Sequence, residues 1–304
     1  MKRKHDTDAT RSVVRMTEQS ESSSEQSGET TDQSTELSAP SDVFVSDVLA
    51  GQVAFVTGGG TGIGKEIARV LGRHGARIAI ASRRRDVLEA TAAELGAEGI
   101  DVWLDTFDVR KADEVERVTQ GIIDQFGRLD ILINNAAGNF PAPMTKISYN
   151  GFKSVVDIDL LGTYNCSKCA FEKWMRTNGG NIVNIAAAFE LKGIAFQAHV
   201  AAAKSGVLSL TRTCAVEWGP YGVRVNGVNP GSTGNTEGVR RFAEAVRGGD
   251  SRPTNPMGVM SHGQDIALCV LFLVSPSARH VSGQVISVDG GGSVDQLKMT
   301  LPRD

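Results

Sequence analysis

Runs rich in apolar residues alternate with helical patterns along most of the chain. The runs that fit buried strands lie at 53–56, 77–83, 102–109, 129–138 and 181–185. Apolar residues in a segment between two such runs recur at helical spacing, as at Ile63, Ile67, Val70 and Leu71. Strands that alternate with helices in this way form parallel βαβ units. The pattern therefore predicts an α/β fold built on a parallel sheet.

A glycine-rich turn follows the first predicted strand. Residues 57–64 read Thr-Gly-Gly-Gly-Thr-Gly-Ile-Gly and lead into a helix. Glycines let the backbone approach a pyrophosphate, whose charge is then held by free N–H groups and by the positive end of the helix dipole. Taken alone, the turn is equally compatible with a tight connection that binds nothing. With the strand pattern, it predicts a Rossmann-type doubly wound sheet in a single domain.

The end of the second predicted strand bears on the choice of cofactor. It carries Ser82 and Arg83, where enzymes specific for NAD tend to have an acidic residue. The planar guanidinium of Arg83 suits a 2′-phosphate, because it binds phosphate oxygens by charge-assisted hydrogen bonds. NADPH is therefore predicted as the cofactor. For Arg84 and Arg85, the ordinary interpretation of a solvated helix start is preferred.

Composition divides the chain into a tail and a domain. Residues 1–45 are polar, acidic and poor in apolar side chains, so they are predicted to be disordered. Residues 46–304 are predicted to form the single domain, with 40% hydrophobic and 22% charged residues in the whole chain. Residues 232–258, rich in Gly, Ser, Thr and Arg, are predicted to form a substrate lid.

Charge and hydropathy limit the partners and the location. A net charge of −3 gives no indication of a nucleic-acid partner. No apolar stretch approaches the roughly 20 residues that span a bilayer, and 266–274 is predicted to be a buried helix. Neither a signal peptide nor a peroxisomal C-terminal tripeptide is expected, so a cytoplasmic location is predicted.

Cysteines give no indication of a metal or redox site. Cys166 and Cys169 form a C-x-x-C, but they fall within a helical pattern and have no second pair at metal-ligand spacing. Redox motifs of this kind begin a helix after a strand. All four cysteines are therefore interpreted as ordinary thiols, and no metal is predicted.

Ordered motifs over residues 50–292 resemble those of the short-chain dehydrogenase/reductase family. They are Thr-Gly-x-x-x-Gly-x-Gly at 57–64, Asn-Asn-Ala-Ala-Gly at 134–138 and Pro230-Gly231. The resemblance implies cofactor contacts at residues Thr57, Gly58, Thr61, Gly62, Ile63, Gly64, Ser82, Arg83, Asp108, Val109, Asn135, Ala136, Lys204, Pro230 and Gly231. For Asp108, a structural cap remains an equal alternative. The family also implies a homo-oligomer, a tetramer or a dimer.

The chain departs from that family at its proton donors. In the family, a tyrosine stands four residues before the lysine, a serine lies near the fifth strand and an asparagine lies on the long helix; here these are Val200, Ala187 and Asp159. Valine and alanine cannot exchange a proton, which counts against reduction of a ketone. Tyr164 and Lys168 have the tyrosine-to-lysine spacing but precede the fifth strand, so they are dismissed as the active pair.

Reduction of a conjugated thioester fits the residues that remain. Hydride goes to a carbon remote from the carbonyl, and the proton returns to carbon. The chain resembles the peroxisomal type of 2,4-dienoyl-CoA reductase at Phe140, Asp159, His199 and Lys204. The resemblance implies that Asp159 and Lys204 are catalytic and that the product is a 3-enoyl-CoA; Leu208 replaces a further aspartate of that type.

The other roles have alternatives. Asp159 either assists protonation, directly or through water, or anchors helices. His199 either orients a water or is a structural histidine, and Phe140 packs either on the acyl chain or in the core. Arg240 and Arg241 are candidates for CoA phosphates or are surface arginines.

Two rival functions remain open. The chain either reduces a trans-2-enoyl-CoA with NADPH or binds a dinucleotide as a scaffold without catalysis. Enoyl reductases of fatty-acid synthesis have a tyrosine seven residues before the lysine, where this chain has Gln197. Turnover with a 2,4-dienoyl-CoA but not with a 2-enoyl-CoA is the expected discriminating result.

Overall fold

The computed structural model describes residues 43–188, 193–234 and 255–295, together with the single residues 236, 240, 243, 244 and 248. All of them belong to one compact unit, Ser38–Asp304. Residues 1–42 of the predicted tail lie outside the described residues. The boundary at residue 45 therefore stays a prediction.

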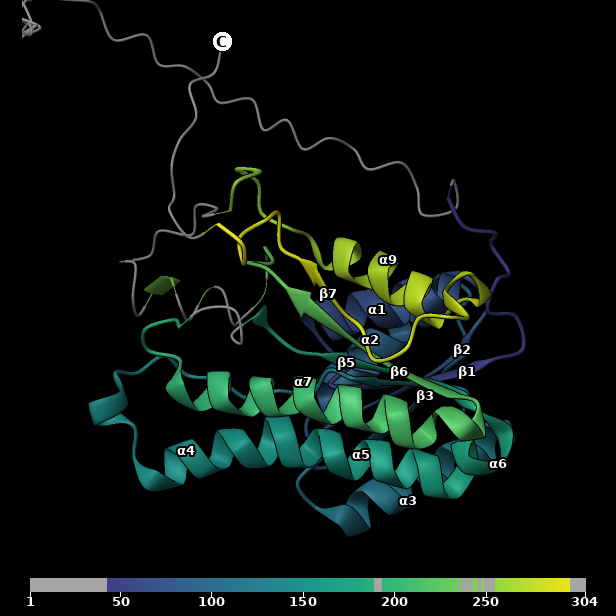
Figure 1. The fold of residues 1–304 in the computed structure, drawn as a ribbon. Coiled ribbons are helices and arrows are strands. Elements are labelled where there is room, and N and C mark those ends of the chain that lie inside the picture. Colours follow the sequence, from purple (N-terminus) through teal and green to yellow (C-terminus); the bar gives the residue numbers. More distant parts are fainter. Residues whose placement is uncertain are drawn as a thin grey trace, which may run out of the picture. The chain divides into compact units, whose positions relative to one another are not determined.

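One parallel sheet forms the centre of the described chain (Figure 1), and it contains seven strands in the order β3-β2-β1-β4-β5-β6-β7. The strands are β1 (Val53–Thr57), β2 (Arg77–Ser82), β3 (Val102–Thr106), β4 (Ile131–Asn134), β5 (Gly180–Ile185), β6 (Val223–Pro230) and β7 (Val285–Val288). The order reverses between β1 and β4, which opens a crevice for ligands at the carboxyl ends of these strands. The predicted doubly wound α/β fold is confirmed.

Helices cover both faces of the sheet (Figure 1). One face carries α1 (Gly62–Arg73), α2 (Arg85–Ala97) and α9 (Gly263–Val274). The other carries α3 (Ala112–Phe126), α5 (Gly162–Ala170) and α7 (Ala198–Trp218), with α4 (Tyr149–Val156) and α6 (Arg176–Asn178) on either side of α5 along the chain. The buried helix predicted at 266–274 is confirmed within α9. No helix in the described ranges is long and apolar enough to span a bilayer.

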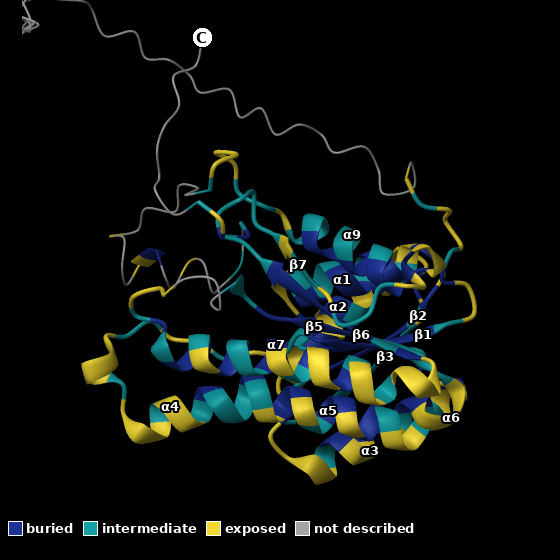
Figure 2. Cartoon of the chain, in the orientation of Figure 1, coloured by how far each residue is buried: buried dark blue, intermediate teal, exposed yellow. Residues whose placement is uncertain are grey.

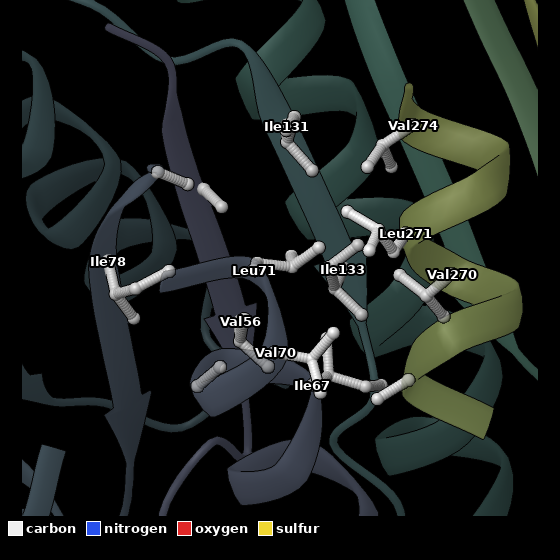
Figure 3. Close-up of a cluster of buried hydrophobic side chains, with 14 of the residues drawn as sticks. Val56, Ile67, Val70, Leu71, Ile78, Ile131, Ile133, Val270, Leu271 and Val274 are labelled. Atoms are coloured by element: carbon white, nitrogen blue, oxygen red, sulfur yellow. The ribbon is translucent and has the colours of Figure 1, made fainter. Parts of the chain in front are cut away.

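The hydrophobic core is divided by the sheet into two layers. Val56, Ile78 and Ile133 point toward α1 and α9, where Leu71 and Leu271 meet them (Figure 3). Their neighbours along the strands pack on the opposite face, because successive strand residues alternate between faces. Each such side chain is worth about 1.5–3 kcal/mol when fully buried. With both faces covered, the central strands are almost wholly buried (Figure 2), which explains why they form continuous apolar runs.

A π-helical turn interrupts the long helical segment before β5. It is η3 (Asp157–Leu161), and it joins α4 directly to α5. The Asp159 carbonyl in this turn accepts a hydrogen bond from the Thr163 hydroxyl at 2.7 Å. A second π-helical turn, η4 (Phe171–Met175), joins α5 to α6. Turns of this kind are frequent at functional sites.

The predicted lid is described mainly at its two ends. Gly234 and Ser261 are joined by a backbone hydrogen bond of 2.8 Å, and Met257 N–H donates to the Gly290 carbonyl at 3.4 Å. The first bond holds the start of the segment to the residues before α9, and the second holds its end to the turn after β7. Most of the region between them, including Arg241, lies outside the described residues.

Candidate active site

The turn after β1 has the backbone that a dinucleotide phosphate requires. Gly58 has a φ of 67°, which glycine adopts without strain. A Cβ on Gly64 would lie 2.4 Å from Asn135 Nδ2, so a side chain here would displace the loop after β4. In this part of the described chain, no acidic residue occupies the first turn of α1, and Thr61 makes no side-chain cap. The first N–H groups of α1 are therefore free for phosphate oxygens, and the turn fits the predicted dinucleotide.

Thr57 and Asn135 hold that turn against the end of β4. The Thr57 hydroxyl accepts hydrogen bonds from the backbone N–H groups of Asn135 and Ala136, both at 3.0 Å. The Asn135 amide in return donates to the carbonyls of Thr57 and Gly58, at 3.0 and 3.2 Å. These predicted cofactor residues thus have clear structural contacts. Their contact with a cofactor stays a prediction.

The predicted adenine side lies beyond β2 and β3. Arg83 is exposed, and within the described residues it has no carboxylate within ion-pair distance. Asp108, in contrast, accepts from Arg110 Nε at 2.9 Å, and its own N–H donates to Glu114 at 2.8 Å. The hydrogen bond with Arg110 lowers the pKa of Asp108. These contacts favour the structural alternative for Asp108 and leave Arg83 available to a phosphate.

Lys204 lies on α7 at the end of β5, as the motif order predicted. Its Nζ donates to the Ile185 carbonyl at 2.9 Å, and its side chain is only 8% exposed. At the same edge of the sheet, Gly231 directly follows β6 and packs tightly against the residue after β7. A Cβ on Gly231 would lie 2.7 Å from Asp289 Cα. Lys204 and the Pro230-Gly231 turn therefore lie at the carboxyl edge of neighbouring strands, where nicotinamide binding is predicted.

Asp159 is fully buried and lies opposite Lys204. Its Oδ1 accepts a hydrogen bond from the Gly138 N–H at 2.7 Å, and its Oδ2 lies 3.4 Å from Lys204 Nζ. Burial raises the pKa of Asp159, and the Lys204 charge and the Gly138 N–H act in the opposite direction. A raised pKa keeps a carboxyl protonated at a higher pH, which is the direction a proton donor requires. The structure thus brings the two predicted catalytic residues together.

Phe140 and His199 form the adjoining wall. Their rings lie edge to face with centroids 4.4 Å apart. His199 is fully buried, and burial lowers its pKa, which favours the neutral imidazole. Phe140 also packs on Gly151 of α4 and is 37% exposed, so it lies at the rim of the site and not in the core.

Gln197 is a polar residue near this group to which the sequence analysis gave no role. It was noted only because enoyl reductases have a tyrosine at its position. It precedes α7, is 3% exposed, and accepts from Asn139 Nδ2 at 2.7 Å. Its place two residues before His199 is a signal that could have indicated it. Leu208, which replaces an aspartate of the resembled type, is buried in an apolar cluster with Ala186 and Val207.

The remaining candidates lie away from this group. Tyr164 is 45% exposed on α5, and Lys168 pairs with Glu172, so the dismissed tyrosine–lysine pair faces outward. Arg240 is exposed and pairs with Glu244 at 3.0 Å. Arg240 and Arg241 stay predicted substrate contacts.

The cysteines carry no sign of reactivity in the described chain. Cys166 and Cys169 are free and buried on α5, and burial raises the pKa of both thiols. A raised pKa suppresses the thiolate, which is the nucleophile and the metal ligand. No group of His, Cys, Asp and Glu among the described residues is arranged to hold a metal ion.

Known proteins are similar to this chain in sequence and in fold. Residues 58–293 match the family described as enoyl-(acyl carrier protein) reductase. The chain is 44% identical over 254 residues to a peroxisomal 2,4-dienoyl-CoA reductase [(3E)-enoyl-CoA-producing] of Danio rerio, covering 82% of this chain and 84% of that protein. It is 38% identical over 244 residues to a probable 2,4-dienoyl-CoA reductase [(2E)-enoyl-CoA-producing] of Bacillus subtilis, covering 79% and 96%.

Solved structures agree with these relatives. A short chain dehydrogenase from Bacillus anthracis is 36% identical with a TM-score of 0.71, covering 81% of this chain and 98% of that one. A variant of actinorhodin polyketide ketoreductase with NADPH is 29% identical with a TM-score of 0.76, covering 80% and 97%. From the matched family, the curated relatives and the shared fold, the chain belongs to the short-chain dehydrogenase/reductase family.

Proposed function

We propose that this protein reduces a 2,4-dienoyl-CoA to a 3-enoyl-CoA with NADPH. The observation that carries the proposal is the buried pair of Asp159 and Lys204 in a site with Val200 and Ala187 at the family's hydroxyl positions. The relative of Danio rerio, at 44% identity, is named for this activity, and so is one of Arabidopsis thaliana at 41%.

The reaction balances without an acid at the carbonyl oxygen. When bound, NADPH supplies a hydride to the far carbon of the diene. The electron pairs of the two double bonds then shift toward the thioester, giving a dienolate with charge on its oxygen. A proton added to the carbon next to the thioester leaves one double bond between the third and fourth carbons.

Asp159 is assigned the proton that ends on carbon. Its buried carboxyl has a raised pKa, so it retains a proton better than an exposed aspartate does. It delivers the proton directly or through a water, and we leave both routes within the proposal. The Lys204 ammonium pairs with Oδ2 of the Asp159 carboxyl. We assign to Lys204 a hydrogen bond with the hydroxyls of the nicotinamide ribose.

The preference for NADPH is supported by two observations. Arg83 is exposed at the end of β2 and has no carboxylate partner among the described residues, which leaves its guanidinium available for a 2′-phosphate. The ketoreductase neighbour at a TM-score of 0.76 is a complex with NADPH.

The acyl-CoA substrate is assigned to the side of Phe140 and His199. The Phe140 ring, 37% exposed at the rim, offers an apolar surface to the acyl chain. Arg240 and Arg241 are assigned to the CoA phosphates, for which Arg240 would have to exchange its exposed ion pair with Glu244. Such a pair contributes little, on the order of 0–1 kcal/mol, so the exchange costs little.

Reduction of a 2-enoyl-CoA is the second candidate. It is favoured by the family description, enoyl-(acyl carrier protein) reductase. The position seven residues before Lys204 is Gln197, which lacks the phenol of those reductases. A scaffold without catalysis is the third possibility, and the same assay distinguishes all three.

The test is NADPH oxidation, followed by absorbance, with the purified full chain. Turnover with a 2,4-dienoyl-CoA, no turnover with a 2-enoyl-CoA, and a 3-enoyl-CoA product would support the proposal. Turnover with the 2-enoyl-CoA alone would replace it by the second candidate. NADPH binding, measured by fluorescence, without turnover on either would leave the scaffold.

We also propose a homo-oligomer and a cytoplasmic location. The outer face of the helical segment before β5 exposes large side chains, including Tyr149 at 98% and Leu161 at 40%, which suits burial against a second copy. Light scattering of the purified chain tests the oligomer. The named relatives from animals, plants and yeast are peroxisomal, so cell fractionation is the test of location.

A further inference from the structure

A short loop after β4 is held against η3 and against the residues at the start of α7. Gly138 N–H donates to Asp159, and Asn139 donates to Gln197 Oε1, both at 2.7 Å. The Phe140 ring meets the His199 ring at 4.4 Å. Ala142 N–H donates to the Phe196 carbonyl at 3.1 Å, and Phe196 has a φ of 68°, which is rare for a residue with a side chain. The loop therefore gathers Asp159, Gln197 and His199 beneath it.

Several buried polar atoms in this group have no hydrogen-bond partner. Among the described residues, they are Gln197 Nε2 and the ring nitrogens of His199, although the Phe140 backbone lies near enough to the His199 ring to raise its pKa. Asp159 Oδ2 faces Lys204 Nζ at 3.4 Å. A buried donor left without a partner costs about 1–3 kcal/mol. Two residues with such donors, held by one loop beside Asp159 and Lys204, are the arrangement of a site that a polar ligand completes.

We propose that the Gln197 amide and the His199 imidazole donate hydrogen bonds to the thioester carbonyl oxygen and stabilise the negative charge that forms there. This inference deepens the proposed function and rests on it. It assigns the two residues as catalytic, in place of the hydroxyl groups that Val200 and Ala187 do not provide.

The chemistry of these donors suits a proton that ends on carbon. A neutral amide N–H and a neutral imidazole N–H stabilise an enolate oxygen by hydrogen bonding but keep their own protons. No bond to either residue forms or breaks. The electron pair that the hydride adds is shared between the oxygen and the carbon chain, and Asp159 then supplies the proton to the carbon next to the carbonyl.

The same contacts explain how the donors are aimed. Gln197 Oε1 accepts from Asn139, so the amide is oriented with Nε2 left free. The edge-to-face contact with Phe140 fixes the plane of the imidazole. Donors that are fixed before the substrate arrives do not have to reorganise as the charge develops, which is the property that makes such sites effective.

Gln197→Met and His199→Leu test the two donors, because each removes the hydrogen bond and retains a similar volume. Each is expected to lower kcat for a 2,4-dienoyl-CoA about 10²- to 10³-fold, the usual loss for one such donor. The dissociation constant of NADPH should stay unchanged. His199→Gln, which restores an N–H, should recover part of kcat.

A spectroscopic measurement separates this role from a structural one. In the complex of the wild-type protein with NADP⁺ and a 2,4-dienoyl-CoA, polarisation of the conjugated carbonyl should move the dienoyl absorbance to longer wavelength. Both donor variants should reduce that shift. His74→Leu is the matched control, because His74 is also buried with Nε2 unpartnered but lies at the end of α1; it should leave kcat and the absorbance shift unchanged.

The outcomes distinguish the inference from the proposed function. A wild-type protein without turnover on a 2,4-dienoyl-CoA would overturn both. Wild-type turnover combined with an unchanged absorbance shift in Gln197→Met and His199→Leu would overturn the inference alone. A donor variant that fails to bind NADPH is misfolded, and two other results then decide. The absence of an absorbance shift in the wild-type protein would overturn the inference. A His199→Gln variant that binds NADPH but recovers no kcat would also overturn the inference.

Discussion

The dinucleotide half and the substrate half of the site differ in how their polar groups are satisfied. In the first, Thr57 and Asn135 hydrogen-bond one another's backbones and hold the glycine turn without any ligand. In the second, Gln197 and His199 are buried with nitrogens that have no partner in the described chain. The difference supports the proposal of a preformed cofactor platform beside a substrate site whose polar groups are completed by the ligand.

The largest expected effect comes from the substrate half. Asp159→Ala should lower dienoyl-CoA turnover about 10²- to 10⁴-fold, because it removes a positioned proton donor. NADPH affinity should change little, because Asp159 itself is assigned no cofactor contact and Lys204 keeps its hydrogen bond to the Ile185 carbonyl. Steady-state kinetics and a fluorescence titration measure the two quantities. Unchanged turnover would exclude Asp159 from the chemistry.

Arg83 tests the cofactor half next. Arg83→Ala should weaken NADPH binding about 10- to 100-fold, as expected for the loss of a charged hydrogen bond worth about 1.5–3 kcal/mol, and should leave NADH binding nearly unchanged. Arg84→Ala is the matched control, because Arg84 is also exposed and is its neighbour. Equal losses of NADPH affinity in the two variants would show that the positive charge of the region matters, and not a specific contact of Arg83.

The pH dependence follows from the sign of the Asp159 shift. Burial raises the pKa of its carboxyl, so the protonated form persists to higher pH than in an exposed aspartate. Activity should be full below that pKa and fall about tenfold per pH unit above it. In Asp159→Asn, the residual activity should no longer fall with rising pH in this way. If the same fall persists, the titration of another group causes it.

The smallest effect concerns the platform itself. Gly64→Ala places a Cβ 2.4 Å from Asn135 Nδ2, and overpacking of this kind costs about 1–3 kcal/mol of stability. Gly96→Ala is the control, because nothing lies within 4 Å of a Cβ there. Thermal unfolding should show a lower Tm for Gly64→Ala and an equal or higher Tm for Gly96→Ala. Equal Tm values would show that the Asn135 loop yields easily.

The sequence predicted the fold and the backbone of the glycine turn best, because their signals are local. A strand, a glycine turn and a helix lie within residues 53–73, so spacing alone indicates them. Asp159 and Lys204 are 45 positions apart in the sequence, and only the family resemblance paired them. The π-helical turn that contains the buried Asp159 was not predicted from the residue pattern.

Gln197 shows why the rest of the site could not be predicted. In the sequence it is one polar residue before a helix. Only the structure shows that its amide is buried with Nε2 unpartnered, which indicates a ligand contact. Asp108 is a second example, since the sequence left adenine contact and a structural role equally open, and only the structure shows that Arg110 contacts its carboxylate. Local patterns identify backbone features well, but the partners of a side chain are set by contacts distant in sequence.

The central claim is that the proton ends on carbon, and one measurement tests it most directly. The wild-type protein is supplied with NADPH and a 2,4-dienoyl-CoA in D₂O, and the product is examined by NMR. We predict a 3-enoyl-CoA with a single deuterium on the carbon next to the thioester. A reduced product without deuterium on that carbon, or no reduced product from the dienoyl-CoA, would contradict the account.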